Sequence, residues 1–133
     1  MKNYSQIYLV DDFAMSNLIH KALFKKLQVG DDIQVFTNPE KALADLRLKI
    51  GETKKILILL DLNMPEMSGF EFLDIMVNEN FPSLIDVIIA TSSISEKDKT
   101  KAEKYPQFVK NFITKPMKID CLRNVLKPIH KAS

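Results

Sequence analysis

The five residues Ile56–Leu60 read ILILL, and Asp61 follows them directly. A short run that is apolar at every position is typical of a strand buried on both faces, which is the kind of strand that a parallel sheet contains. A carboxylate at the carboxyl end of such a strand is expected at the rim of the sheet, where open α/β sheets bind their ligands. The run Ile7–Val10 is followed in the same way by Asp11 and Asp12. The sequence therefore predicts one acidic site at the rim, to which two strands contribute.

Strand-like and helix-like segments alternate along the whole chain. Helix boundaries are marked by Asn38 before Pro39, by Gly51, and by Ser68 before Gly69. We expect Pro128 to kink or end the last helix. Five strands alternating with five helices predict an α/β fold, a doubly wound five-stranded parallel sheet with helices on both faces. The expected strands are residues 6–10, 33–36, 56–60, 85–90 and 111–114, and the expected helices are residues 13–27, 39–50, 69–80, 96–104 and 119 onward.

The first helix carries apolar residues at helical spacing, which is typical of a face that packs on a core. His20 and His130 are isolated and lack the spacing of metal ligands, so we expect both at the surface. The pair Asp31-Asp32 is expected to form a turn before the second strand. The apolar residues of the first helix are Met15, Leu18, Ile19, Ala22 and Leu23.

Composition indicates an ordinary globular protein with an uneven charge distribution. The net charge is +2. Residues 95–133 contain 10 Lys/Arg against 4 Asp/Glu, whereas the remainder contains 9 against 13. The basic part lacks interleaved stacking aromatics and a Gly-rich nucleic-acid loop, so we interpret it as a solvated surface or a site for an acidic protein partner, and not as a nucleic-acid site. The single cysteine, Cys121, excludes an internal disulfide, and no run is long and apolar enough to span a bilayer. We therefore expect a cytoplasmic protein without a signal peptide.

The clustered carboxylates predict a metal site. Asp11, Asp12 and Asp61 would repel one another unless a cation neutralised them. Mg²⁺ suits this role, because it prefers oxygen ligands and keeps several waters, so that few protein ligands are needed. Taken alone, Asp11-Asp12 is equally consistent with a polar turn after a strand.

Two further strand ends add groups that suit a phosphoryl anion. Thr91 offers a hydroxyl after the fourth expected strand, and Lys115 offers an ammonium group after the fifth. Phosphoryl transfer mainly requires positioning and charge neutralisation, and a carboxylate can itself be the nucleophile that forms an aspartyl phosphate. Asp61 is the best candidate for that nucleophile. Taken alone, a residue such as Thr91 is more often a helix cap or turn residue than a phosphate ligand, and Phe112 is most simply a core residue.

The arrangement of these residues resembles the receiver domain of two-component response regulators. The resemblance covers nearly the whole chain and is carried by Asp11-Asp12, by the stretch Leu60–Pro65 with Gly69, by Thr91, and by Phe112–Pro116. It implies a flavodoxin-like strand order 2-1-3-4-5. It also implies a single receiver domain over residues 1–133, similar to the stand-alone chemotaxis regulators, with no output domain.

The resemblance assigns a role to each site residue. It implies that Asp61 accepts a phosphoryl group from a phosphohistidine on a sensor histidine kinase or a histidine phosphotransfer protein. Asp12 would bind Mg²⁺ directly, Asp11 would assist through water, and Asn63 would supply its backbone carbonyl. Lys115 would pair with the phosphoryl oxygens.

The resemblance also implies a conformational switch. Thr91 would move to hydrogen-bond a phosphoryl oxygen, and Phe112 matches an aromatic residue that turns inward on activation. The face formed by the fourth helix, the fifth strand and the fifth helix would then change its contacts with a downstream protein, and a homodimer formed on phosphorylation stays open. A cis bond before Pro116 is expected. Phe112 departs from the tyrosine often found in the family, and the segment from Tyr105 to Phe108 departs from the usual Gly-Ala pair.

Two other function classes stay open from the sequence. One is a Mg²⁺-dependent phosphatase with an aspartyl nucleophile, although Asn63 stands where such enzymes usually place a second acid and cannot act as one. The other is a receiver-like scaffold that binds partners without phosphorylation. The leading expectation is a signalling module that catalyses only its own phosphorylation and dephosphorylation, and not a turnover enzyme.

Overall fold

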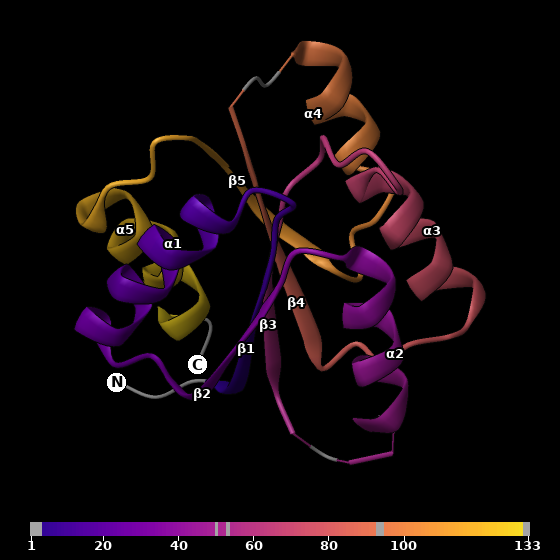
Figure 1. Ribbon diagram of the computed structural model, residues 1–133, viewed down its shortest axis with the longest axis horizontal. Helices are drawn as coiled ribbons and strands as arrows, with labels where there is room; N and C mark the ends of the chain where they lie inside the picture. The colour runs from indigo at the N-terminus through magenta and orange to yellow at the C-terminus, as the bar shows by residue number, and fades with distance from the viewer. Residues whose placement is uncertain (1–3, 50, 53, 93–94, 132–133) are drawn as a thin grey trace.

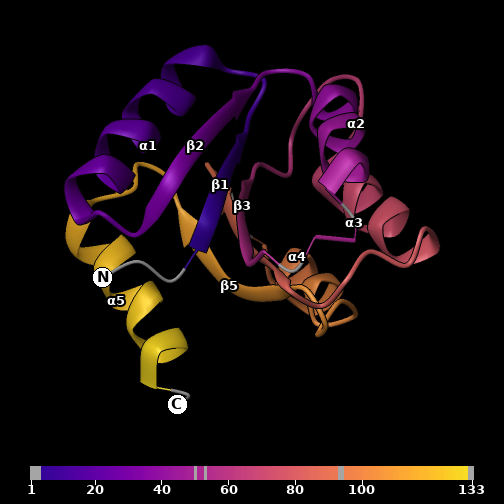
Figure 2. The ribbon, with the colours of Figure 1, turned by 90° about the horizontal axis from the view of Figure 1, so that it is seen from below.

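The computed structural model describes residues 4–49, 51–52, 54–92 and 95–131. Five parallel strands form one sheet in the order β2-β1-β3-β4-β5, so the predicted fold class and strand order are confirmed. The helices cover both faces, with α1 and α5 on one side and α2, α3 and α4 on the other (Figures 1 and 2). The elements are β1 (Tyr4–Val10), α1 (Ala14–Leu27), β2 (Gly30–Phe36), α2 (Pro39–Lys49), β3 (Ile56–Leu60), α3 (Gly69–Asn78), β4 (Ile85–Thr91), α4 (Glu96–Ala102), β5 (Val109–Thr114) and α5 (Ile119–Lys131).

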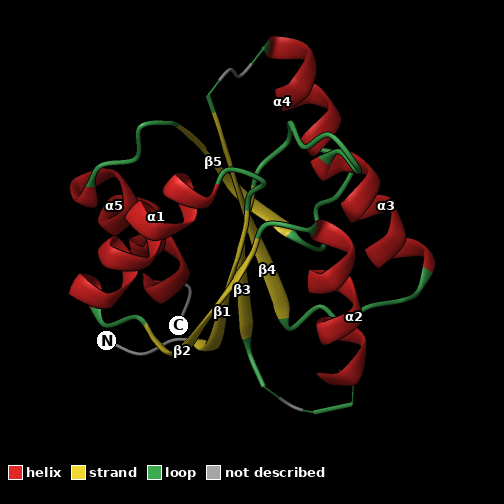
Figure 3. Ribbon diagram, in the orientation of Figure 1, coloured by secondary structure: helices red, strands yellow, loops and turns green. Residues whose placement is uncertain are grey.

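The central strands carry the two hydrophobic cores. Every residue of β3 and β4 is buried. Because side chains alternate across a strand, β1 sends Ile7 and Leu9 into the core beneath α1 and α5, and Tyr8 and Val10 into the core beneath α2, α3 and α4. Because neighbouring strands are parallel, their carboxyl ends lie at the same rim, from which the chain passes into the following helices (Figure 3).

Local capping explains where several helices begin. The Ser68 hydroxyl accepts a hydrogen bond from the Glu71 backbone, and the Glu71 carboxylate accepts one from the Ser68 backbone, which is a complete capping box before α3. Asn38 accepts from the Glu40 backbone before α2, as the sequence predicted. At Gly69 a Cβ atom would lie 2.7 Å from the Asp61 carbonyl oxygen. Only glycine therefore allows α3 to start this close to the end of β3.

One boundary prediction is wrong. The pair Asp31-Asp32 lies inside β2 and not in a turn, because early residues of β2 pair with Tyr4 and Gln6 of β1. The last helix continues past Pro128 to Lys131, so the proline does not end it, and the kink that was the other expectation stays a prediction.

The predicted core face of α1 is wrong except at Leu23. Met15, Leu18 and Ile19 face solvent, whereas Phe24 is buried and Leu23 and Leu27 are half-buried against the core. Apolar residues therefore occupy two opposite sides of this helix, and periodicity alone could not choose between them. The inner side also contains Asn17 and His20, so the expectation that His20 lies at the surface is wrong; the side chain of His130 lies outside the described part of the structure.

Candidate functional site

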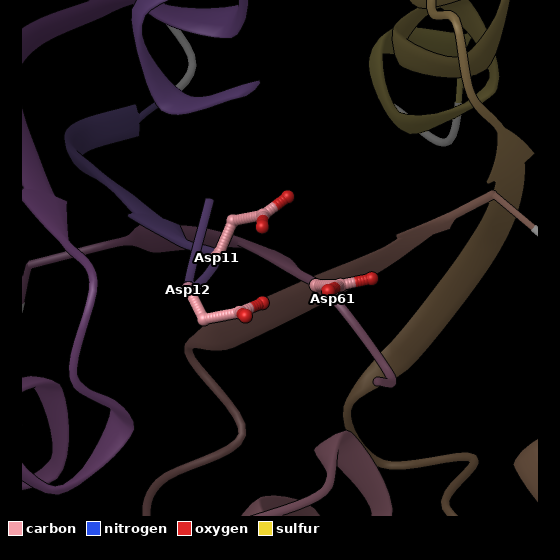
Figure 4. Close-up of side chains that lie close together, drawn as sticks. All are labelled: Asp11, Asp12 and Asp61. Carbon is pink, nitrogen blue, oxygen red and sulfur yellow. The ribbon is translucent and has the colours of Figure 1, made fainter. Parts of the chain in front are cut away.

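Three aspartates from two strand ends meet at the rim of the sheet. Asp11 and Asp12 follow β1, and Asp61 follows β3. These residues lie close together because β1 and β3 are adjacent parallel strands that end at the same level. Each residue offers a carboxylate oxygen within 4.8 Å of the others. Figure 4 shows the three side chains extending into one space. Asp11 and Asp61 are buried and Asp12 is exposed, so the cluster opens to solvent on the Asp12 side.

Lys115 supplies a cation to this cluster. It follows β5, and its backbone N–H donates to the Thr91 carbonyl at the end of β4 at 2.9 Å. Its Nζ donates to Asp11 Oδ2 and lies 3.5 Å from Asp61 Oδ1. The other oxygen of Asp11 accepts from the Phe13 backbone at 2.9 Å. The peptide bond between Lys115 and Pro116 is cis, as expected.

Burial and the charges of the cluster shift the pKa of Asp61. Burial, and then the negative charge of Asp11, raise the pKa of Asp61, whereas Lys115 and a hydrogen bond from the Asn63 backbone oppose that rise. Burial and the nearby Lys115 lower the pKa of His20 on the inner side of α1. The carboxylate pocket therefore favours a bound cation beyond the one that Lys115 provides.

The remaining predicted residues lie on the β4 and β5 side of the cluster. Thr91 is the last residue of β4 and is fully buried. Its hydroxyl accepts a hydrogen bond from the Asn63 side chain at 3.2 Å. The sequence predicted only a backbone role for Asn63, so this side-chain contact is new. Phe112 in β5 is half-buried against the core and lines a groove of about 430 Å³ beside α4.

Sequence reasoning missed one residue that shapes the site. The buried side chain of Asn17 donates to the backbone carbonyls of Asp11 and Phe36. The only signal in the sequence was an amide residue in a helix interior, which is a disfavoured place unless its side chain finds backbone partners.

The donor set fits a hard divalent cation. The cluster offers three carboxylate oxygens within 4.8 Å of one another, close enough to bind one ion. Mg²⁺ prefers such oxygen ligands, and the exposed side at Asp12 leaves room for the waters that it keeps. Soft or imidazole ligands do not contribute to this cluster, and no second group of three or more His, Cys, Asp or Glu occurs within the described residues. The cluster therefore suits a divalent cation that prefers oxygen ligands, and Mg²⁺ is one such cation.

Comparison with known proteins matches residues 7–127 to the response regulator receiver domain. The chain belongs to this family. Receiver domains are the regulated modules of two-component signalling, so the predicted family and signalling class are confirmed.

Individual relatives agree with this assignment. The chain is 27% identical over 125 residues to a probable methanogenesis regulatory protein, FilR2, from Methanothrix harundinacea, covering 92% of this chain and 79% of that protein. It is 26% identical to a response regulator receiver protein from Dyadobacter fermentans, with a TM-score of 0.78 and coverage of 92% and 95%. A two-component response regulator from Cytophaga hutchinsonii shares the fold, with a TM-score of 0.82, 24% identity and coverage of 98% and 99%.

The helices in the described part of the chain do not have the length and hydropathy of a membrane span. Across residues 4–49, 51–52, 54–92 and 95–131, every helix is too short or too polar to cross a bilayer.

Proposed function

We propose that this receiver domain is a phosphorylation switch in which Asp61 accepts a phosphoryl group from a phosphohistidine on a histidine kinase or histidine phosphotransfer protein. One observation carries the proposal: Asp61 lies among Asp11, Asp12 and Lys115, with its oxygen 3.5 Å from the Lys115 ammonium. Such a site combines a nucleophilic carboxylate, ligands for a cation and a fixed positive charge. Phosphoryl transfer needs these three elements.

Each side chain of the site would have a separate role in the phosphoryl transfer. An Asp61 oxygen attacks phosphorus while the bond from phosphorus to the donor histidine nitrogen breaks, and the bonding electron pair goes to that nitrogen. Asp11, Asp12, Asp61 and the Asn63 backbone carbonyl would hold Mg²⁺, which would neutralise charge on the phosphoryl oxygens. Lys115 Nζ, already beside Asp61, would exchange a carboxylate contact for a phosphoryl oxygen.

The β4–β5 side would respond to the new charge. A phosphoryl group on Asp61 offers acceptor oxygens within the reach of Thr91, whose hydroxyl would leave Asn63 to donate to one of them. Phe112 is half-buried beside the groove under α4, so an inward turn would bury more of its ring and reshape the surface of α4, β5 and α5. This surface would carry the signal to a downstream protein.

The direct test is labelling with acetyl phosphate and Mg²⁺. We expect a labile acyl phosphate on Asp61, located by borohydride reduction and mass spectrometry, and its loss when EDTA is present during labelling. Label on another residue, or labelling that does not depend on a divalent cation, would contradict the proposal. Turnover of phosphate esters without a stable phosphoprotein would instead favour a phosphatase.

The outer side of α1 supports a helical phosphodonor. Phe13, Met15, Leu18 and Ile19 have exposed fractions of 62%, 53%, 63% and 51%. Contiguous exposed apolar side chains of this kind mark interaction sites. The patch begins at Phe13, directly after Asp12, so it lies beside the site that the donor histidine would have to reach. We propose that an apolar helix of the donor packs on this patch.

Two leucine variants separate docking from chemistry. Leu18→Ser should slow phosphotransfer from a phosphorylated histidine donor by roughly 10-fold, as expected for an interface anchor, and should leave acetyl phosphate labelling unchanged. Leu48→Ser on α2, where the leucine is also exposed, is the matched control and should transfer at the parent rate. Equal rates for both variants, or an equal loss with acetyl phosphate, would argue against docking on α1.

A further inference from the structure

The inner side of α1, which packs on the core, contains the buried polar side chain of Asn17. Asn17 is 1% exposed. Both hydrogens of its amide are used: Nδ2 donates to the Asp11 carbonyl oxygen at 3.0 Å and to the Phe36 carbonyl oxygen at 3.1 Å. The side chain therefore joins the loop after β1 to the end of β2.

This bridge fixes the backbone that presents the acidic cluster. The Asp11 carbonyl belongs to the peptide unit that joins Asp11 to Asp12, and a planar peptide sets the direction of the chain at Asp12. The Asp11 backbone N–H also donates to the Phe36 carbonyl, at 3.1 Å. Both sides of Asp11 are thus tied to the same point at the end of β2.

Asp12 depends on this backbone more than its neighbours do. The Asp11 carboxylate is held by Lys115 and by the Phe13 backbone, and Asp61 lies beside Lys115. Within the described residues, the exposed carboxylate of Asp12 has no hydrogen bond or ion pair that would orient it. The position of the Asp12 carboxylate relative to Asp61 is therefore set by the backbone at Asp11 and Asp12, which Asn17 holds in place.

The two hydrogen bonds of Asn17 come with a cost at this position. Among the described residues the Asn17 Oδ1 atom is buried without a hydrogen-bond partner, which is a cost that an apolar side chain would avoid. The pair formed by Tyr4 and Asp86 shows the alternative, a buried polar contact at the opposite edge of the sheet in which the hydroxyl donates to the carboxylate at 2.8 Å.

We propose that Asn17 is a positioning residue for Asp12, and that it sets the Mg²⁺ affinity of the cluster through the Asp11–Asp12 peptide. This proposal rests on the proposed function, because it concerns the same metal site. Asn17 is not among the residues that would hold the metal or the phosphoryl group, since its side chain donates to backbone carbonyls. Removing a group that orients metal ligands typically weakens metal binding by 10–100-fold.

The test compares Asn17→Leu with Tyr4→Phe. Leucine has the branching and the number of side-chain heavy atoms of asparagine but cannot bridge the two carbonyls, and Tyr4→Phe removes one buried hydrogen bond far from the site. Mg²⁺ titration followed by amide NMR signals should give a dissociation constant about 10-fold higher for Asn17→Leu and unchanged for Tyr4→Phe. Asn17→Ser, which can donate at most one of the two hydrogen bonds, is the second variant if Asn17→Leu folds poorly, and it should also bind more weakly.

The outcomes distinguish this proposal from the proposed function. An unchanged dissociation constant in the Asn17 variants, or an equal rise in Tyr4→Phe, would overturn the positioning role. If the parent protein does not bind Mg²⁺, the proposed metal site fails. The positioning role is then judged on the metal-free protein, where the ¹⁵N order parameter of the Asp12 amide should fall in the Asn17 variants and stay at the parent value in Tyr4→Phe. An unchanged order parameter would overturn it.

Discussion

Asp61 and Asp86 are two aspartates of equal burial in opposite surroundings. Each is 6% exposed. Asp61 follows β3 at the carboxyl edge of the sheet, and Asp86 lies near the start of the neighbouring strand β4, at the amino edge. Asp86 accepts a hydrogen bond from the Tyr4 hydroxyl at 2.8 Å. Asp61 instead lies within 4.8 Å of two other carboxylates.

The difference shows that burial alone does not make a carboxylate functional. At Asp86 the Tyr4 hydroxyl donates to the carboxylate, and burial together with Asp86 raises the pKa of Tyr4 and keeps its hydroxyl protonated. At Asp61 the like charge of Asp11 adds to the effect of burial, and Lys115 offsets only part of it. The carboxyl edge therefore has a cluster of like charges that favours an added cation, whereas Asp86 belongs to no such cluster among the described residues.

The largest expected effect separates the two aspartates by chemistry. Asp61→Asn should abolish labelling by acetyl phosphate and Mg²⁺, a loss of at least about 100-fold, because an amide oxygen is a poor nucleophile. Asp86→Asn should label at the parent rate. It should unfold about 1 kcal/mol more easily, because a neutral hydrogen bond replaces a charge-assisted one.

The measurement is the rate of phosphoprotein formation for the parent and both variants, with urea unfolding to confirm that each is folded. Labelling of Asp61→Asn at the parent rate would remove Asp61 from the mechanism. Loss of labelling in a folded Asp86→Asn protein would show that the amino edge also takes part.

The positions of Asp11, Asp12 and Asp61 at strand ends could be predicted from the sequence, because they depend on the residues directly before them. Runs that are apolar at every position must be buried on both faces, and the charged residue after each run must emerge at the rim. The sequence thus predicted that Asp11, Asp12 and Asp61 lie together, and the structure places them within ligand distance. Their roles in phosphoryl transfer stay predictions.

The orientation of α1 could not be predicted, because it depends on contacts between distant segments. Periodicity favoured the side with Leu18 and Ile19 as the core side, whereas the structure buries Phe24 and the side chain of Asn17. The hydrogen bond from Asn17 to the Phe36 carbonyl joins residues 19 apart in the sequence. A contact between residues so far apart produces no periodic pattern of apolar residues from which it could be predicted.

The second prediction concerns the response of stability to Mg²⁺. A ligand that binds only the folded protein stabilises it by about 1.4 kcal/mol at ten times its dissociation constant. Mg²⁺ should therefore raise the melting temperature of the parent and of Asp86→Asn by similar amounts, and that of Asp61→Asn much less. Thermal unfolding with and without Mg²⁺ measures this. An equal shift for all three proteins would place the cation outside the cluster.

The smallest expected effect is the pH dependence of the metal-free protein. The pKa of Asp61 is raised in the folded state, so the folded protein holds this proton at a pH where the unfolded chain has released it. The stability that the proton contributes is fully present below the unfolded pKa, about 4, and is lost as pH rises through the folded pKa. At neutral pH the metal-free Asp61→Asn variant should therefore be more stable than the parent, by about 1 kcal/mol or a few degrees in Tm.

This gain should shrink as the pH is lowered below the folded pKa of Asp61, because the parent then also holds a neutral side chain at that position. Urea unfolding of parent, Asp61→Asn and Asp86→Asn, in EDTA between about pH 8 and about pH 4, measures the differences, in which the shared titration of His20 cancels. Asp86→Asn should be less stable than the parent at neutral pH, since it loses a favourable charge-assisted bond and relieves no repulsion between carboxylates. If Asp61→Asn and Asp86→Asn change the free energy of unfolding in the same direction at neutral pH, the contrast between the two edges of the sheet is not electrostatic. Repulsion among the carboxylates would then not explain why the acidic cluster favours a cation.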